Sequence, residues 1–119
     1  MQEVDRTRRV SELIRRELST LIAREVDDQR VKLVSITGVT VSRDLKQATV
    51  YVSSVEKSVS AAETEKILNH AGKYLRYLLG QHTHLRTTPA LLFKYDDSIR
   101  RGVEMSTLID SLNKKHVEG

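Results

Sequence analysis

A helical stripe interrupted by a glycine is the feature of the sequence that most restricts its fold. From Ser60 to Gly80 the apolar residues recur at steps of three and four, the spacing of one face of an amphipathic helix. Ser60 followed by Glu63 is a capping-box pattern, and Gly80 is predicted to end the helix as a left-handed cap. Gly72 lies in the middle beside Ala71, although an interior glycine costs about 1 kcal/mol relative to alanine. The pair predicts a kink or a close approach of another backbone segment; one unbroken helix that tolerates glycine is the alternative.

The remaining elements follow from the same kind of periodicity. Residues 7–28 carry an unbroken amphipathic stripe, which predicts a helix packed within the domain. Alternating apolar residues predict strands at 32–41, 47–53 and 89–95, the first two forming a hairpin. In the first strand the apolar residues have even numbers before Gly38 and odd numbers after it. Both sets can face the core only if one residue is extra, which predicts a β-bulge at Gly38. A short helix is expected from about Ser106.

These elements predict an α+β fold in the order α-β-β-α-α-β with a short C-terminal helix. Helices packed on one face of a three-stranded sheet would make a two-layer sandwich. With 119 residues, of which 39% are apolar, the chain is long enough for one core. We therefore expect one domain over residues 1–112 and a polar, frayed tail over 113–119.

Several classes of protein are disfavoured by composition. The chain has no cysteine, so disulfides, zinc thiolate sites and thiol nucleophiles are absent. No apolar run reaches the roughly 18 residues that a membrane span needs, and the N-terminus lacks an apolar signal region. A soluble, cytoplasmic protein is the expectation.

Positive charge is concentrated in two zones of the sequence, within a net charge of +4. Residues 6–16 carry five arginines against one glutamate, and residues 73–101 carry six lysines and arginines against two aspartates. Residues 17–30 between them are net acidic. Such polarity favours a surface that binds a polyanion such as nucleic acid, whereas a mixed solvated exterior is the alternative.

The order of elements, with two helices meeting at a small-residue joint, is similar to that of type II KH domains. KH domains clamp a nucleic-acid backbone with a GXXG loop, and this chain has Ala71-Gly72-Lys73 at the joint instead. A set of short segments, taken in this order and spacing, makes the comparison more specific: Arg9-Val10, Arg24-Glu25-Val26, Val41-Ser42-Arg43-Asp44-Leu45, Ala48-Thr49-Val50-Tyr51-Val52, Leu75-Arg76, Leu78-Leu79-Gly80, Leu85-Arg86 with Pro89, Tyr95-Asp96 with Ser98, and Gly102 with Met105-Ser106 and Leu108-Ile109. Through these segments the chain resembles, over nearly its whole length, the ribosome-binding factor A family, whose members are bacterial KH-like proteins. That family typically has Ala-x-Gly at the joint; aligned on Ala71, Lys73 stands at the glycine position and Gly72 one place earlier.

The resemblance implies a late maturation factor of the small ribosomal subunit. Such a protein binds the free 30S particle rather than the complete ribosome, and it assists 16S rRNA processing near the 5′-terminal helix. It is not an enzyme, and it needs no cofactor, metal, small-molecule substrate or membrane. We expect a monomer, because no second apolar face is left unexplained. Two alternatives remain: a general KH-like RNA-binding module without a ribosomal partner, and a small metal-dependent nuclease that uses Asp96, Asp97 and a histidine.

Basic side chains near the joint and in the hairpin turn are the candidates for contacts with RNA phosphates. Lys73 and Arg76 flank the joint where KH domains meet nucleic acid, and the others belong to the basic zone or the turn. Each could instead be a solvated surface residue. The full predicted set is Arg43, Lys46, Lys73, Arg76, Arg86, Arg100 and Arg101, with the helix kink at Ala71 and Gly72.

Other residues that could carry chemistry are weaker candidates. His82 and His84 lack a third suitable ligand nearby, so we predict no zinc site. Tyr51 on the outer face of its strand is expected to pair with cross-strand neighbours, base stacking being the alternative. Arg8, Arg9, Arg15 and Arg16 are expected to be the solvated face of their helix, a second RNA-binding patch being the alternative.

Overall fold

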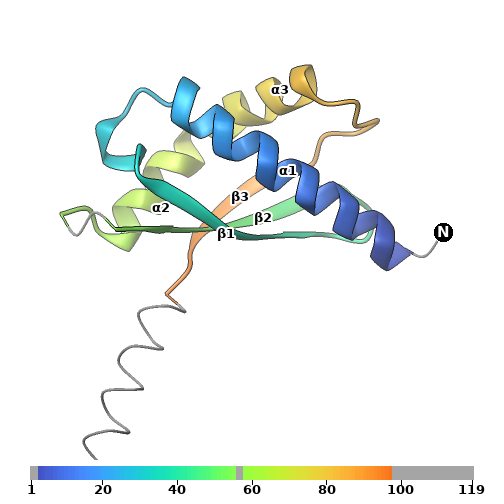
Figure 1. Ribbon diagram of the computed structural model, residues 1–119, viewed down its shortest axis with the longest axis horizontal. Coiled ribbons are helices and arrows are strands. Elements are labelled where there is room, and N and C mark those ends of the chain that lie inside the picture. The colour runs from blue at the N-terminus through green and yellow to red at the C-terminus, as the bar shows by residue number, and fades with distance from the viewer. Residues whose placement is uncertain (1–2, 56–57, 98–119) are drawn as a thin grey trace, which may run out of the picture.

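The computed structural model describes residues 3–55 and 58–97, and its elements follow the predicted order α-β-β-α-α-β (Figure 1). The N-terminal helix begins earlier and ends earlier than predicted, and a 3-10 turn, η1, follows it. The predicted C-terminal helix and tail lie outside the described residues. The elements are α1 (Glu3–Glu25), η1 (Gln29–Val31), β1 (Val34–Val41), β2 (Gln47–Ser54), α2 (Ala61–His70), α3 (Gly72–His82) and β3 (Ala90–Tyr95).

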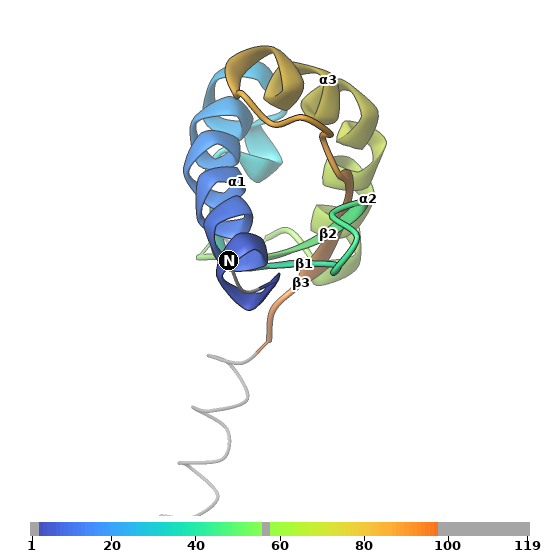
Figure 2. The same cartoon turned by 90° about the vertical axis from the view of Figure 1, so that its right-hand side faces the viewer.

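The three strands form one mixed sheet in the order β1-β2-β3. β2 lies in the centre, antiparallel to β1 and parallel to β3. A parallel neighbour requires a crossover connection, which α2 and α3 supply. The helices pack on one face of the sheet, so the predicted α+β sandwich is confirmed (Figure 2).

The hydrophobic core lies between this face of the sheet and the helices. The stripe of α1 supplies one layer, the inward residues of the strands supply the other, and α2 and α3 complete it. Phe93 of β3 is among the largest of the fully enclosed side chains, with 1% of its surface exposed. The core residues include Ile14, Leu18, Leu21, Ile22, Ile36, Val41, Ala48, Val50, Val52, Leu68, Leu75, Leu79 and Phe93.

A β-bulge in β1 confirms the change of parity predicted at Gly38. Ile36 pairs with Val52 and Gly38 pairs with Tyr51, so Thr37 is the extra residue. The bulge lets the apolar residues on both sides of it reach the same core. Thr37 itself donates its hydroxyl to Asp96 Oδ2 at 2.6 Å, which ties β1 to the end of β3.

Side chains of α2 cover the outer edge of β3. Asn69 Oδ1 accepts a hydrogen bond from the Phe93 N–H at 2.8 Å, and Asn69 Nδ2 donates to the Phe93 carbonyl at 3.0 Å. One helical turn earlier, Glu65 Oε1 accepts from the Tyr95 N–H at 3.2 Å. Residues four apart on a helix share a face, and here they meet alternate residues of the strand. This edge is therefore protected against pairing with another chain.

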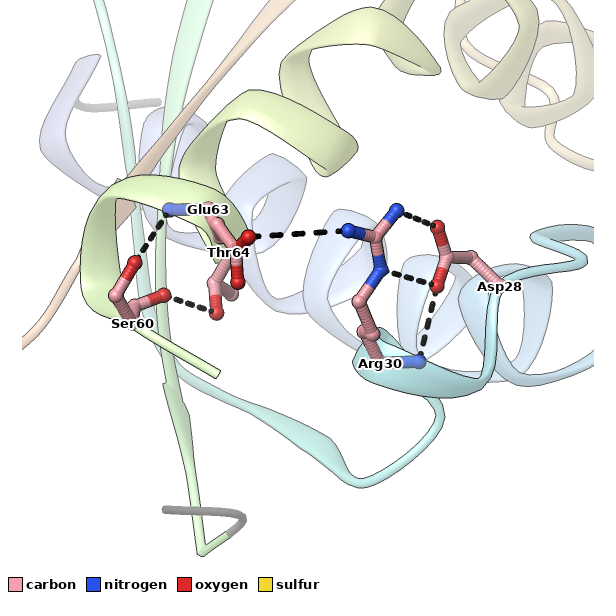
Figure 3. Close-up of polar contacts among 5 residues, drawn as sticks. All are labelled: Asp28, Arg30, Ser60, Glu63 and Thr64. Atoms are coloured by element: carbon pink, nitrogen blue, oxygen red, sulfur yellow. Dashed lines mark hydrogen bonds and ion pairs between the residues drawn. The ribbon is translucent and has the colours of Figure 1, made fainter. Parts of the chain in front are cut away.

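The start of α2 is held by a polar cluster that joins it to η1 (Figure 3). Ser60 Oγ accepts a hydrogen bond from the Glu63 N–H at 3.0 Å, as the capping-box pattern predicts. The Glu63 carboxylate, however, faces Arg30 at 3.9 Å instead of the backbone of Ser60, so the box is only half formed. Arg30 also donates to both carboxylate oxygens of Asp28, and its hydrogen bonds lower the pKa of that carboxyl.

At Ala71, beside Gly72, α2 ends and α3 begins, so the predicted helical stripe is divided between two helices (Figure 2). Gly72 is buried, and a Cβ added to it would lie 3.7 Å from the carbonyl oxygen of Leu91, an ordinary contact distance. The strand backbone therefore approaches the joint without excluding a methyl group.

Gly80 does not end the helix, which corrects the predicted left-handed cap. α3 continues to His82 and is capped by Thr83, and no described glycine has a positive φ. Gly80 is instead a close-approach residue, because a Cβ there would lie 2.9 Å from the Thr88 hydroxyl oxygen. A glycine near a helix end is compatible both with a left-handed cap and with close approach of another segment, so the sequence pattern alone did not distinguish these two roles.

We expect Gly80→Ala to lower the free energy of unfolding by about 1–2 kcal/mol. Overpacking lowers stability by about 1–3 kcal/mol, and the higher helix propensity of alanine offsets this loss by up to about 1 kcal/mol. Urea unfolding would measure the effect. Gly72→Ala is the matched control and is expected to leave stability unchanged or raised, while adding Thr88→Ala should relieve the Gly80→Ala defect. Equal effects of the two glycine substitutions would contradict the role given to Gly80.

Candidate nucleic-acid interface

Three basic segments converge where β3 begins. Arg76 of α3 donates from Nε to the Thr88 carbonyl at 3.0 Å. The Ala90 N–H donates to the carbonyl of Lys46, at the end of the β1–β2 turn, at 2.9 Å. Arg86 precedes Thr88 by two residues in the same loop. The fold thus attaches α3 and the hairpin turn to one short segment, residues 88–90.

The predicted phosphate-binding residues that the structure describes are all exposed. None of them forms an ion pair within 4.0 Å of a described carboxylate, in contrast to Arg8, Arg16 and Arg30. Their charges are therefore available to an external anion. The five residues are Arg43, Lys46, Lys73, Arg76 and Arg86; Arg100 and Arg101 lie outside the described residues.

The β1–β2 turn that carries Arg43 and Lys46 is closely hydrogen bonded. Asp44 Oδ1 accepts from the Ser42 hydroxyl at 2.7 Å and from the Lys46 N–H at 3.0 Å. These bonds, led by the one from Ser42, lower the pKa of the Asp44 carboxyl. Leu45 adopts a left-handed conformation with φ of 61°, while its side chain packs against the core. The two basic side chains consequently project from a turn whose backbone is well defined.

Two exposed tyrosines on α3 were not among the predicted site residues. Tyr74 and Tyr77 are 50% and 61% exposed, and they lie outside the apolar stripe formed by Leu75 and Leu79. Their position off the stripe and their spacing of three residues were visible in the sequence. Tyr77 lines a depression of about 570 Å³ together with Lys73, Arg76, Gly80, Gln81 and Thr88. The convergence of these side chains with the loop before β3 was not visible in the sequence.

The other candidate residues have structural surroundings. Tyr51 is half-buried, and its register neighbours are Gly38 on one side and Lys94 on the other. The Asp96 carboxylate accepts a hydrogen bond from the Thr37 hydroxyl. Within residues 3–55 and 58–97, no three His, Asp or Glu side chains gather as a metal site would require, His82 and His84 included. In the same part of the chain, none of the helices combines the length and apolar character that crossing a bilayer requires.

Known proteins resemble this chain in both sequence and fold. A family model described as ribosome-binding factor A matches residues 6–109. Ribosome-binding factor A of Nitrosococcus oceani is 46% identical over 118 residues, which cover 99% of this chain and 93% of that protein. The one from Ectopseudomonas mendocina is 44% identical over 124 residues, covering 99% and 96%.

Solved structures of more distant relatives share the fold. The crystal structure of ribosome-binding factor A from Thermus thermophilus has a TM-score of 0.65 and 23% identity, covering 73% of this chain and 92% of that one. A Thermus thermophilus homology model fitted into a cryo-EM map of a complex with the 30S particle has a TM-score of 0.62 and 24% identity, covering 73% and 91%. At these identities the likeness supports the fold alone.

Proposed function

Since this chain belongs to the ribosome-binding factor A family, we propose that it is a non-catalytic assembly factor that binds the free 30S subunit. Its family name describes a ribosome-binding factor, and a Thermus thermophilus relative has been fitted into a map of a complex with the 30S particle. The chain would act as a monomer without a cofactor. It would assist late maturation of the subunit and 16S rRNA processing near the 5′-terminal helix.

The observation that carries this proposal is the convergence of unpaired basic residues at the start of β3. Arg76 and Lys46 are joined to residues 88–90 by hydrogen bonds, and Arg86 lies in the same loop. A surface of this kind suits the phosphates of folded RNA, which are bound by charge and shape. The single phenylalanine, Phe93, is buried in the core and cannot read an unpaired base.

We propose a non-catalytic role partly because of the surroundings of Asp96, which with Asp97 follows the end of β3. A metal-dependent nuclease would need carboxylates free to hold a divalent cation. Asp96 instead accepts a hydrogen bond of 2.6 Å from Thr37, which links two strands. The nuclease alternative would be favoured if the pure protein cleaved precursor rRNA only with divalent metal and Asp96→Ala abolished the cleavage.

Co-sedimentation with separated ribosomal particles tests the proposal. The protein is expected to pellet with 30S particles and to stay in the supernatant with 70S ribosomes. Binding should fall steeply between about 50 and 200 mM salt, because neutralised phosphates release counterions. Equal recovery with 30S and 70S particles, or an affinity that salt does not change, would overturn it. Binding to free RNA without binding to 30S particles would favour the general KH-like module.

A further inference from the structure

We propose that the depression beside α3 receives one unstacked nucleotide of RNA, with its base on the ring of Tyr77 and its phosphate against Lys73 and Arg76. This inference rests on the proposed function, because it names how part of the same interface engages its RNA. The residues that line the depression supply an aromatic ring, two cations and two neutral polar side chains, from Tyr77, Lys73, Arg76, Gln81 and Thr88.

The aromatic wall of the depression is available to a ligand. Tyr77 is 61% exposed, whereas its neighbours Leu75 and Leu79 are fully buried and hold α3 on the core. The ring of Tyr77 is therefore not part of the core cluster. Bases of any identity can stack on an exposed aromatic side chain, because each base has a π-face.

The floor and rim of the depression are set by contacts within the fold. Gly80 has no side chain, and the Thr88 hydroxyl lies so close that even a Cβ would approach it to 2.9 Å. Arg76 Nε donates to the Thr88 carbonyl at 3.0 Å, which holds the guanidinium on the rim and leaves its terminal nitrogens for an anion. A cation held in place before binding loses less conformational entropy when it meets a phosphate.

The chemistry of the lining favours a nucleotide over other ligands. Lys73 and Arg76 have no carboxylate partner within the described residues, so both positive charges are available to an anionic group of a ligand. Gln81 and the Thr88 hydroxyl have no hydrogen-bond partner in that part of the chain and could meet a base edge. A volume of about 570 Å³ lies within the range of sites that hold one small ligand.

The test measures binding of short oligoadenylate and of an abasic ribose-phosphate oligomer of equal charge. The unmodified protein is expected to bind oligoadenylate about 5- to 150-fold more tightly than the abasic oligomer, the range that stacking of one base provides. Tyr77→Ala should abolish this preference, and Tyr77→Phe should retain it. Tyr74→Ala is the matched control, because Tyr74 is also exposed on α3 but does not line the depression.

The outcomes separate this inference from the proposed function. If 30S particles are bound but Tyr77→Ala keeps the preference for oligoadenylate, the nucleotide site is wrong and the assembly-factor proposal stands. If Tyr74→Ala loses the preference as fully as Tyr77→Ala does, the assignment to this depression is also overturned. If oligoadenylate is preferred through Tyr77 but 30S particles are not bound, the site is supported and the proposed function fails. Unchanged circular dichroism and urea unfolding of Tyr77→Ala would show that the substitution acts on binding alone.

Discussion

Lys73→Gln combined with Arg86→Gln is expected to weaken binding to the 30S subunit by about 10- to 100-fold at 0.15 M salt. Each basic residue that neutralises a phosphate adds to the affinity of the protein for RNA through counterion release. The fold-losses caused by the two substitutions therefore multiply. The slope of log K against log salt should become less steep by about 2, one unit for each lost contact. Quantitative co-sedimentation or fluorescence anisotropy over a salt series would measure both effects.

These two residues are chosen because they form no hydrogen bond or ion pair within the described residues, so their replacement should leave the fold intact. Arg76, in contrast, also binds the Thr88 carbonyl. The matched control is Arg6→Gln with Arg15→Gln, which makes the same change in net charge on the exposed side of α1. If the control weakened binding as much as the test variant, the loss of affinity would be explained by overall charge and not by an interface at the start of β3.

Phe93→Ala is expected to lower the free energy of unfolding by about 3–5 kcal/mol, the range for loss of a large enclosed aromatic side chain. Phe93 is 1% exposed and pairs in register with Val50 of the central strand, so it packs between the sheet and the helices. A cavity at this place would be surrounded by rigid elements on both sides and could close only in part. Urea unfolding followed by circular dichroism would measure the loss.

Leu92→Ala is the matched control for this second prediction. Leu92 is the adjacent residue of the same strand and points to the opposite face, in register with Thr49. We expect it to cost about 1 kcal/mol or less, since it lies outside the core cluster. Similar costs for both substitutions would mean that the register assigned to β3, and hence the face on which the helices pack, is incorrect.

The α-helices and strands that the structure describes were predictable, because each is recorded in the spacing of apolar residues, whereas η1 was not predicted. A helix buries every third or fourth residue and a strand every second, so the period identifies the element and its inward face. A bulge in this strand, predicted at Gly38 and found at the adjacent Thr37, was predictable for the same reason, since two parities in one strand can share a core only if one residue is extra. The two small residues within the helical stripe marked the place where α2 gives way to α3, but they were also compatible with one unbroken helix.

Features that depend on a partner distant in sequence were missed or misassigned. Gly80 was assigned to a helix end, and only the position of Thr88 shows that it allows a close approach. The Glu63 carboxylate was assigned to its own helix start, whereas it faces Arg30 of η1. In both cases the local pattern is compatible with two roles, and the packing of a distant segment selects one of them.

For the candidate interface, the sequence by itself determined which residues carry positive charge and which helices meet at the small-residue joint. Their gathering was decided by tertiary structure alone. Parallel pairing of β2 with β3 sets the end of the hairpin turn beside the start of β3, through the Ala90 to Lys46 hydrogen bond. Arg76 then ties α3 to the same place through Thr88. Charge is a property of single residues, whereas a surface exists only where strand pairing and helix packing bring separate segments together.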